Sequence, residues 1–321
     1  MAKQTWMPIF GNVKIKDGSI TLVPTRVPAT LADAPVAENA PPRIPHAVVR
    51  SNIEFEQGTI AWEGKLSEHS SRAQLILPAE SGPASAADAP KIATAGSDLY
   101  VGLNVLNAPY GMAMYRNSAF EGVGGSGHGS ALPTGEWIPL RLTVRGSNIE
   151  LYVHGVKVVT ASRTLKRGPI GVFLQGNGDC AIRNLTTTQD SPTCFAVMQF
   201  TEEFNVLYTD VIKPVCESYG YKVIRGDDFY TAGQIMEDVT ESIRSSALII
   251  ADVTPDNANV FYEVGYAHAI GKPTILLSDR KRERLPFDIS GFRTLFYDNT
   301  IGGKAIVEAR LTQHLDALHP K

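Results

Sequence analysis

The 321-residue sequence predicts two domains: an antiparallel β-sandwich over residues 1–190 and an α/β domain with a doubly wound parallel sheet over residues 194–321. Two observations predict this division. Before residue 190, apolar and polar residues alternate in short runs separated by Gly, Asn, Ser and Pro, which is typical of strands joined by turns. After residue 193, apolar runs alternate with segments of helical period, which favours a parallel sheet with right-handed crossovers.

The strands predicted in the first domain follow one another closely. The clearest runs with a period of two are 59–62, 73–77, 100–106, 138–144, 149–153 and 171–174. Short Gly-containing segments at 146–148 and 154–155 predict tight hairpins between the later runs. Because two half-buried sheets can bury their apolar faces against each other, these strands predict a sandwich. The glycine-rich stretch 122–129 is expected to form a flexible loop.

The second domain is predicted to alternate strand and helix from its start. The expected strands are 194–200, 221–224, 247–251, 273–277 and 294–297, and the expected helices are 204–215, 235–243, 259–270 and 303–318. In a doubly wound sheet, ligands bind beyond the carboxyl ends of the strands. We therefore expect the functional site in the loops 199–203, 225–229 and 252–259.

Composition and charge argue against several classes of function. The 30 Lys and Arg and 33 Asp and Glu give a net charge of −3, without the one-sided field of a nucleic-acid-binding protein, so we expect no nucleic-acid partner. No export signal and no apolar run of about 20 residues is visible, so we expect no membrane partner and a cytoplasmic location. The three cysteines form no CxxC pair, which favours a reducing compartment. No HExxH or clustered His and Cys pattern occurs, so no metal is expected.

The strongest chemical signal is the segment ADVTPDNANVFYEVGYAHAIGKP, residues 251–273. A polar loop leads from a buried strand into a helix that carries Glu263 about one turn inside its N-terminus. Cleavage of a ribosyl bond builds positive charge on the anomeric carbon. A nearby carboxylate can stabilise that charge, bind the ribose hydroxyls or attack the carbon. The alternative is a solvated carboxylate that the helix dipole favours at this position.

Three strings in the second domain carry a family resemblance: FAVMQF at 195–200, the segment above, and RLPFDISGFRTLFY at 284–297. Together they resemble TIR-like domains related to nucleoside 2-deoxyribosyltransferases, which implies a flavodoxin-like sheet. TIR enzymes cleave NAD to nicotinamide and ADP-ribose or a cyclic product, and deoxyribosyltransferases use a glutamate nucleophile. That glutamate falls on Glu263. The resemblance implies that NAD is the substrate, that no cofactor is needed and that the protein forms a homo-oligomer. Gln199 departs from the family, which often has Pro there.

Five further residues are candidate substrate-binding groups: Phe200, Arg225, Asp252, Asn259 and Tyr266. Phe200 would line a base or nicotinamide pocket, unless it packs in the core. Arg225 would bind a diphosphate, unless it pairs with the acidic residues that follow it. Asp252 would hold the ribose or close a turn. Asn259 ends the polar loop, and Tyr266 shares the helix face of Glu263 or packs in the core.

Residues 137–187 resemble the concanavalin A-like or laminin G-like sandwich, a jelly-roll type. The resembling strings are a strand ending in YVHG, then GPIGVFLQG and a closing IRNL. Such domains often bind glycans or proteins on a concave face. The resemblance therefore implies a glycan or protein ligand, and a role in sensing or assembly.

Taken together, these patterns predict an NAD-consuming N-glycosidase that is regulated by the sandwich and by oligomerisation. By resemblance, the pairing of the two domains implies a role in bacterial antiphage defence. Two alternatives stay open. One is a nucleoside or nucleotide N-glycosidase or deoxyribosyltransferase, and the other is a nucleotide-binding signalling module without catalysis.

Overall fold

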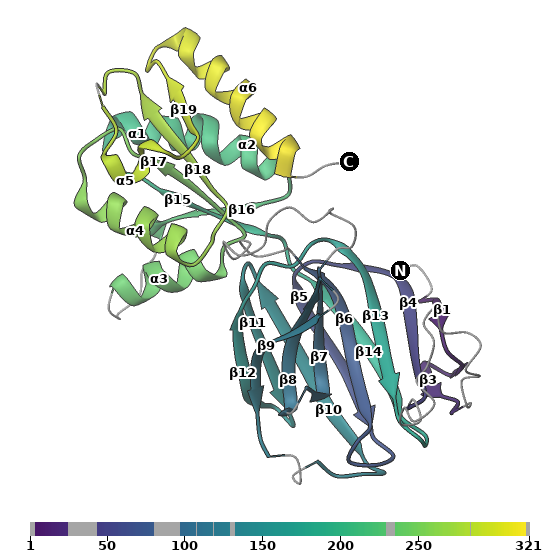
Figure 1. Ribbon diagram of the computed structural model, residues 1–321. Helices are drawn as coiled ribbons and strands as arrows, with labels where there is room; N and C mark the ends of the chain where they lie inside the picture. The colour runs from purple at the N-terminus through teal and green to yellow at the C-terminus, as the bar shows by residue number, and fades with distance from the viewer. Residues whose placement is uncertain are drawn as a thin grey trace. The chain divides into compact units, whose positions relative to one another are not determined.

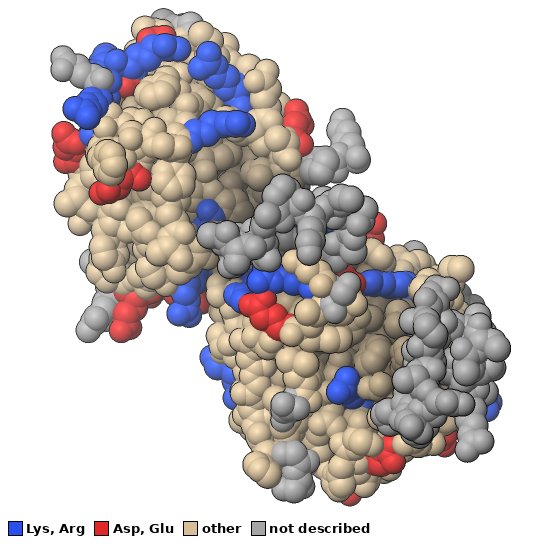
Figure 2. All heavy atoms as spheres, viewed as in Figure 1, with Lys and Arg blue, Asp and Glu red and all other residues tan. Residues whose placement is uncertain are grey.

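The computed structural model describes residues 4–24, 44–79, 97–106, 108–117, 119–128, 132–228, 235–282 and 284–318. The chain divides into two compact units: the first ends at Asp190 and the second begins at Ser191, except that Arg145–Ser147 group with the second. Figure 1 shows strands stacked in two layers in the first unit and a sheet flanked by helices in the second. On the faces visible in Figure 2, each unit carries both basic and acidic side chains.

The first unit consists of two seven-stranded antiparallel sheets. In order across sheet A, the strands are β1 (Trp6–Phe10), β4 (His46–Phe55), β13 (Gly168–Gln175), β6 (Arg72–Ala79), β7 (Ser97–Val105), β8 (Ala108–Arg116) and β9 (Ala119–Ser126). Across sheet B they are β12 (Val156–Ser162), β11 (Asn148–Val153), β10 (Trp137–Arg145), β5 (Gly58–Lys65), β14 (Ala181–Gln189), β3 (Ser19–Leu22) and β2 (Val13–Lys16).

The core of the sandwich lies between these two sheets. Side chains alternate between buried and partly exposed along β4 and β5, as they do when one face of a strand packs against a second sheet. Val49 and Leu75 from sheet A share one apolar cluster with Trp62 and Leu142 from sheet B. Burying such a side chain fully contributes about 1.5–3 kcal/mol. The predicted sandwich is confirmed.

The expectation of a flexible glycine-rich loop at 122–129 is wrong for most of that stretch. Residues up to Ser126 belong to β9, which pairs with β8. The glycines have a packing role there. A Cβ added at Gly124 would lie 2.7 Å from Val159 Cγ1 of β12, and one at Gly125 would lie 2.5 Å from Ala108 Cβ. Glycine therefore allows β9 to approach both neighbouring strands closely.

The second unit contains a five-stranded parallel sheet, as predicted. In spatial order its strands are β16 (Lys222–Arg225), β15 (Thr193–Val197), β17 (Leu248–Asp252), β18 (Thr274–Asp279) and β19 (Thr294–Tyr297). Its helices are α1 (Glu202–Leu207), the π-helical η3 (Tyr208–Ile212), α2 (Lys213–Ser218), the 3-10 turn η4 (Gly226–Asp228), α3 (Ile235–Ser245), α4 (Ala258–Ala269), α5 (Phe287–Ser290) and α6 (Ile301–Leu318).

Apolar clusters occupy both faces of this sheet. On one face, sheet residues such as Ile250 and Leu277 pack with side chains of α1, η3, α2 and α6. On the other face, Ile249 and Leu276 pack with side chains of α3, α4 and α5. Consecutive strand residues point to opposite faces, so a run of apolar residues satisfies both. None of the helices in the described parts of the chain is long and apolar enough to span a bilayer.

The helix predicted at 204–215 differs from the expectation in one detail. The structure places a π-helical turn, η3, between α1 and α2. Spacing along the sequence does not reveal a π turn, because the apolar residues still recur at roughly helical intervals. The turn places the adjacent residues Val211 and Ile212 both in buried positions. Such turns are rare and frequently occur at functional sites.

Candidate functional site

The carboxyl ends of three neighbouring strands bring together four polar residues, which we name the carboxyl-edge cluster: Asp252, Thr254, Asp279 and Tyr297. Asp252, Asp279 and Tyr297 are the last residues of β17, β18 and β19. The Tyr297 hydroxyl donates to Asp252 Oδ2 at 2.7 Å, and the Thr254 amide donates to Asp252 Oδ1 at 2.9 Å. The Asp279 amide donates to Thr254 Oγ1 at 2.8 Å. Parallel strands end at the same edge, so this cluster follows from the sheet order.

Burial governs the electrostatics of the carboxyl-edge cluster. Burial raises the pKa of Asp252 to about 6, against the hydrogen bonds from Thr254 and Tyr297, which lower it. Burial and the neighbouring Asp252 carboxylate raise the pKa of Tyr297, so its phenol stays protonated and donates. Asp279 Oδ2 is buried and has no hydrogen-bond partner in the described residues, although Lys281 Nζ lies 3.9 Å away. Asp252 is itself buried, and it accepts the hydrogen bond from the Thr254 amide. It therefore holds the turn that follows β17.

Glu263 lies on α4, whose start is fixed by Asn257. Asn257 Oδ1 accepts hydrogen bonds from the amides of Asn259 and Val260 at 3.0 and 3.4 Å, which is the usual capping arrangement. Asn257 Nδ2 also donates to Gln199 Oε1 at 3.5 Å. Gln199, the departure from the family pattern, therefore ties the loop after β15 to the start of α4.

The Glu263 carboxyl group is half-buried beside the apolar stripe of α4, which includes Val260 and Val264. In the described residues it has no hydrogen bond or ion pair. Burial raises its pKa to about 7. A half-buried carboxylate without a partner lowers the stability of the fold. Groups with a strongly shifted pKa are concentrated at functional sites. The structure therefore does not match a fully solvated carboxylate.

Arg225 is held by its neighbours and is only 7% exposed. Its Nε donates to Asp227 Oδ1 at 2.6 Å, its Nη2 pairs with Asp227 Oδ2, and its Nη1 donates to Asn205 Oδ1 at 2.8 Å. The guanidinium lies 4.5 Å from the ring centre of Tyr208 and 5.2 Å from that of Phe200. Its charge is therefore balanced by Asp227, one of the acidic residues that follow it, but Arg225 is buried, whereas the alternative was an ion pair on the surface.

The remaining predicted residues have different surroundings. Phe200 is 54% exposed, so it is not a core residue. A Cβ at Gly226 would lie 3.2 Å from Phe200 Cζ, and glycine at that position leaves room for the ring. Asn259 is exposed on the first turn of α4, and Tyr266 packs against the cluster between α4 and the sheet. No hydrogen bond or ion pair in the described residues joins any of them to Glu263. The last residue of the expected loop 225–229 lies outside the described residues, which end at 228 in this part of the chain.

Several residues of the site were not predicted from the sequence. Arg282 donates from Nη1 to the carbonyls of Val253 and Thr254 at 2.9 and 2.7 Å, and from Nη2 to Asp256. It thereby fixes the loop that follows β17. Asp279 and Tyr297 are strand-end residues, and the rule that sites form at strand ends is the signal that would have found both. No group of three or more His, Cys, Asp and Glu in the described ranges is placed to hold a metal ion.

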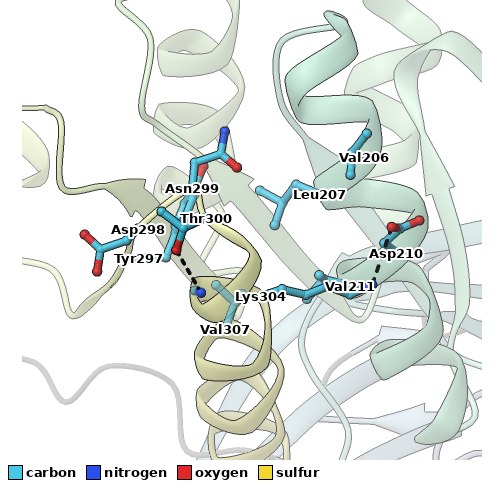
Figure 3. A pocket seen from close by; sticks show the side chains of 11 residues that line it. Val206, Leu207, Asp210, Val211, Tyr297, Asp298, Asn299, Thr300, Lys304 and Val307 are labelled. Atoms are coloured by element: carbon cyan, nitrogen blue, oxygen red, sulfur yellow. Dashed lines mark hydrogen bonds and ion pairs between the residues drawn. The ribbon is translucent and has the colours of Figure 1, made fainter.

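A cavity of about 450 Å³ lies on the face of the sheet covered by α1 and α6 (Figure 3). Residues 206–211 form one side, and residues 297–307 form the other. The ring of Tyr297 is part of its wall, while the Tyr297 hydroxyl donates to Asp252. Glu263 is not among its lining residues, because α4 covers the opposite face of the sheet.

Neither a known protein family nor a curated protein matches this sequence. Three of the solved structures that are similar to this chain match it over 56–58% of its length. The carbohydrate-binding module CBM66 from Bacillus subtilis has 11% identity and a TM-score of 0.39, over 56% of this chain and 93% of that one. A Bacillus licheniformis β-glucanase has 13% identity and a TM-score of 0.39, over 58% and 92%. A lichenase derived from a mouse hindgut metagenome has 15% identity and a TM-score of 0.36, over 56% and 90%.

Proposed function

We propose that the second unit is an N-glycosidase that cleaves NAD between the ribose and nicotinamide, with Glu263 as the carboxylate that stabilises the positive charge of the reacting ribose. The observation that carries the proposal is the half-buried Glu263 carboxyl group, which has no partner in the described residues and a pKa raised to about 7. The strand order β16-β15-β17-β18-β19 supports it. This is the flavodoxin-like order, in which ligands bind beyond the carboxyl ends where the order reverses, between β15 and β17. Helix α4 is the next element after β17.

The chemistry needs little beyond this carboxylate. The bond between C1′ and the pyridinium nitrogen breaks with its electron pair going to nitrogen, so nicotinamide leaves as a neutral molecule. Positive charge then develops on C1′ and the ring oxygen, and an ionised Glu263 lowers the energy of that state. Water adds to C1′ and loses a proton, which gives ADP-ribose. Attack by a hydroxyl or base nitrogen of the same molecule gives a cyclic product instead.

Phe200 and Arg225 support a site for a planar ring. The exposed Phe200 ring is backed by the Arg225 guanidinium, which Asp227 and Asn205 hold in place. A ring fixed in this way is suited to stacking against nicotinamide or a base. In this proposal Arg225 acts through Phe200 and does not bind the diphosphate, because Asp227 already balances its charge.

The proposal is tested by incubating the purified full chain with NAD and, separately, with ribonucleosides and deoxyribonucleosides. Chromatography measures the free base. Release of nicotinamide from NAD is the expected result. Base release from nucleosides alone would favour the nucleosidase or deoxyribosyltransferase alternative. Calorimetric binding of NAD without any product would contradict catalysis and favour the signalling module. Light scattering under the same conditions tests the proposed homo-oligomer and its regulation of activity.

A row of rings favours a second function, glycan binding, for the first unit. The aromatic row consists of Phe10, His46, Phe173, Tyr100, Tyr115 and Phe120, which lie on β1, β4, β13, β7, β8 and β9. Successive ring centres are 4.7 to 6.2 Å apart. Their strand neighbours Ala47, Val172 and Leu99 point into the core, so the row lies on the outer face of sheet A.

Polar groups accompany the aromatic row. Arg50 of β4 and Asp98 of β7 pair at 3.0 Å, and Arg50 Nη1 also donates to the Pro169 carbonyl. Burial raises the pKa of Asp98, while the Arg50 charge opposes this. Ring faces beside directed polar groups suit a sugar, which has both apolar faces and hydroxyls. We therefore propose a neutral oligosaccharide as the ligand. A protein ligand is the alternative, and the row also stabilises the sheet through cross-strand pairs.

Removing one ring of the aromatic row is expected to weaken oligosaccharide binding. Phe120 is 42% exposed, so Phe120→Ala should lower affinity for linear glucose or N-acetylglucosamine hexasaccharides by about fivefold or more, with the fold intact. Titration calorimetry measures the affinity. Val156→Ala is the matched control, because Val156 is exposed on β12 of sheet B. If no hexasaccharide binds, or if both variants bind like the wild type, the glycan proposal fails.

A further inference from the structure

The cavity between residues 206–211 and 297–307, which we name the α6 cavity, has the size of a small-molecule site. Its volume of about 450 Å³ lies within the range of ligand pockets. Its walls are apolar, and its polar side chains come mainly from the segment after β19. The apolar lining consists of Val206, Leu207, Val211, Val307 and the ring of Tyr297, and the polar lining consists of Asp210, Asp298, Asn299, Thr300 and Lys304.

One wall of the α6 cavity has an unusual backbone. It is formed where α1 passes into the π-helical turn η3, which contributes Asp210 and Val211. Val206 on the same wall is 51% exposed, so an apolar side chain at this cavity faces water. A planar apolar molecule in the cavity would cover part of that surface, and burying apolar surface favours binding. The π-helical turn and the apolar lining are two separate observations that favour a ligand in this cavity.

The cavity offers one cationic side chain to a negative group on the ligand, and the two carboxylates that line it, Asp210 and Asp298, each stand in an ion pair. Lys304 is the basic residue among the lining side chains, and it extends toward Asp210 across the space between the two helices (Figure 3). Lys304 Nζ lies 3.4 Å from Asp210 Oδ2, and both side chains are about half exposed. Asp298 pairs with Arg280 at 3.4 Å. Exposed pairs of this kind contribute little and exchange readily. The start of the 18-residue helix α6 also favours negative charge.

We propose that the α6 cavity binds a small planar molecule of one or two aromatic rings that carries a single negative group. The rings lie against Leu207, Val211 and Val307, and the negative group binds Lys304. This site is distinct from the proposed reaction at Glu263, because α4 and α6 cover opposite faces of the sheet. A metal ion does not fit, since no suitable group of three ligands occurs in the described residues.

The test uses the full chain and the probe 8-anilinonaphthalene-1-sulfonate, an aromatic monoanion whose fluorescence rises in apolar surroundings. We expect saturable binding that Lys304→Glu weakens by about tenfold and that Lys304→Arg retains, because charge reversal removes the contact and opposes the anion. Lys213→Glu is the matched control. Lys213 is an exposed residue at the start of α2 and does not line the cavity. Circular dichroism and thermal melting verify that each variant is folded.

A second pair of variants tests the apolar part of the site. Val206→Trp places a large side chain at the cavity wall and should weaken probe binding by about tenfold or more. Ile306→Trp is the control, because Ile306 is similarly exposed on α6 but does not line the cavity. Absence of saturable binding would overturn the proposal. It would also be overturned if folded Lys304→Glu and Val206→Trp variants bound the probe as the wild type does.

Discussion

Replacing Glu263 with glutamine is expected to lower the rate of nicotinamide release from NAD at pH 8 by a factor of at least about 100. Glutamine has nearly the same size but no charge, so it cannot stabilise the positive charge that develops on the ribose, and losing one such interaction typically costs this much. The fold should survive, because the carboxyl group forms no hydrogen bond or ion pair in the described residues. Single-turnover release of nicotinamide measures the effect.

The matched control for that comparison is Glu217→Gln. Glu217 is exposed on α2, on the face of the sheet opposite α4. This variant should release nicotinamide at the wild-type rate. If Glu263→Gln were within about threefold of the control, Glu263 would have no part in the chemistry.

The same Glu263→Gln substitution is expected to stabilise the second unit at pH 8, by up to about 3 kcal/mol. Burial raises the folded-state pKa of Glu263 from 4.5 to about 7. Above pH 7 the wild-type carboxylate is ionised in both states, and ionisation of the buried group is unfavourable in the folded state. Glutamine removes that cost. A gain in stability together with a loss of activity is the usual pattern for a residue kept for function.

The stability gain of Glu263→Gln should depend on pH, and the raised pKa of Glu263 sets the direction of that dependence. Between pH 4.5 and about 7, folded wild-type protein binds more protons at Glu263 than unfolded protein does, so this group's contribution to the free energy of unfolding falls as pH rises. The advantage of Glu263→Gln should therefore be small at pH 4.5 and full above pH 7. Urea unfolding of both proteins across this range measures it. Asp252 titrates in both the wild type and the variant, so its contribution cancels in the difference between their free energies of unfolding. Equal stability at pH 8, or a less stable variant, would contradict the burial of this carboxylate.

Local sequence pattern was sufficient to predict the parallel sheet. Each strand is a short apolar run between polar loops, and the predicted strand 294–297 has the observed bounds. The start of α4 was visible as well, because Asn257 is a capping residue directly before an apolar helix. The Arg225 and Asp227 pair lies within two residues in the sequence, and an ion pair with neighbouring acids was one of its two predicted roles.

Local sequence pattern did not predict the contacts between segments that lie far apart in the chain. Tyr297 lies 45 residues from its hydrogen-bond partner Asp252, and its apolar neighbours make it resemble a core residue. Arg282 reaches back 26 residues to Asp256 for a similar reason. In the sandwich, the glycines of β9 indicated a loop because their local preference is for turns. Close packing against β8 and β12 overrides that preference.

The aromatic row shows the same limit. Its six rings come from six strands, and consecutive members are separated in the sequence by connections of different lengths. Only the order of the strands in sheet A brings Phe173 and Tyr100 across β6 to a ring distance of 5.8 Å. The sequence resemblance implied a ligand for the sandwich, whereas the position of a candidate surface required the sheet topology.

The most direct test of the account is the rate of nicotinamide release from NAD as a function of pH. If ionised Glu263 stabilises the charge on the ribose, the single-turnover rate should rise about tenfold per pH unit below pH 7 and level off above it, because burial raises its pKa to about 7. The rate at pH 8 would then exceed that at pH 5 by about a hundredfold. A rate that is the same at pH 5 and pH 8, or that falls as pH rises, would contradict the assignment of Glu263 as the catalytic carboxylate.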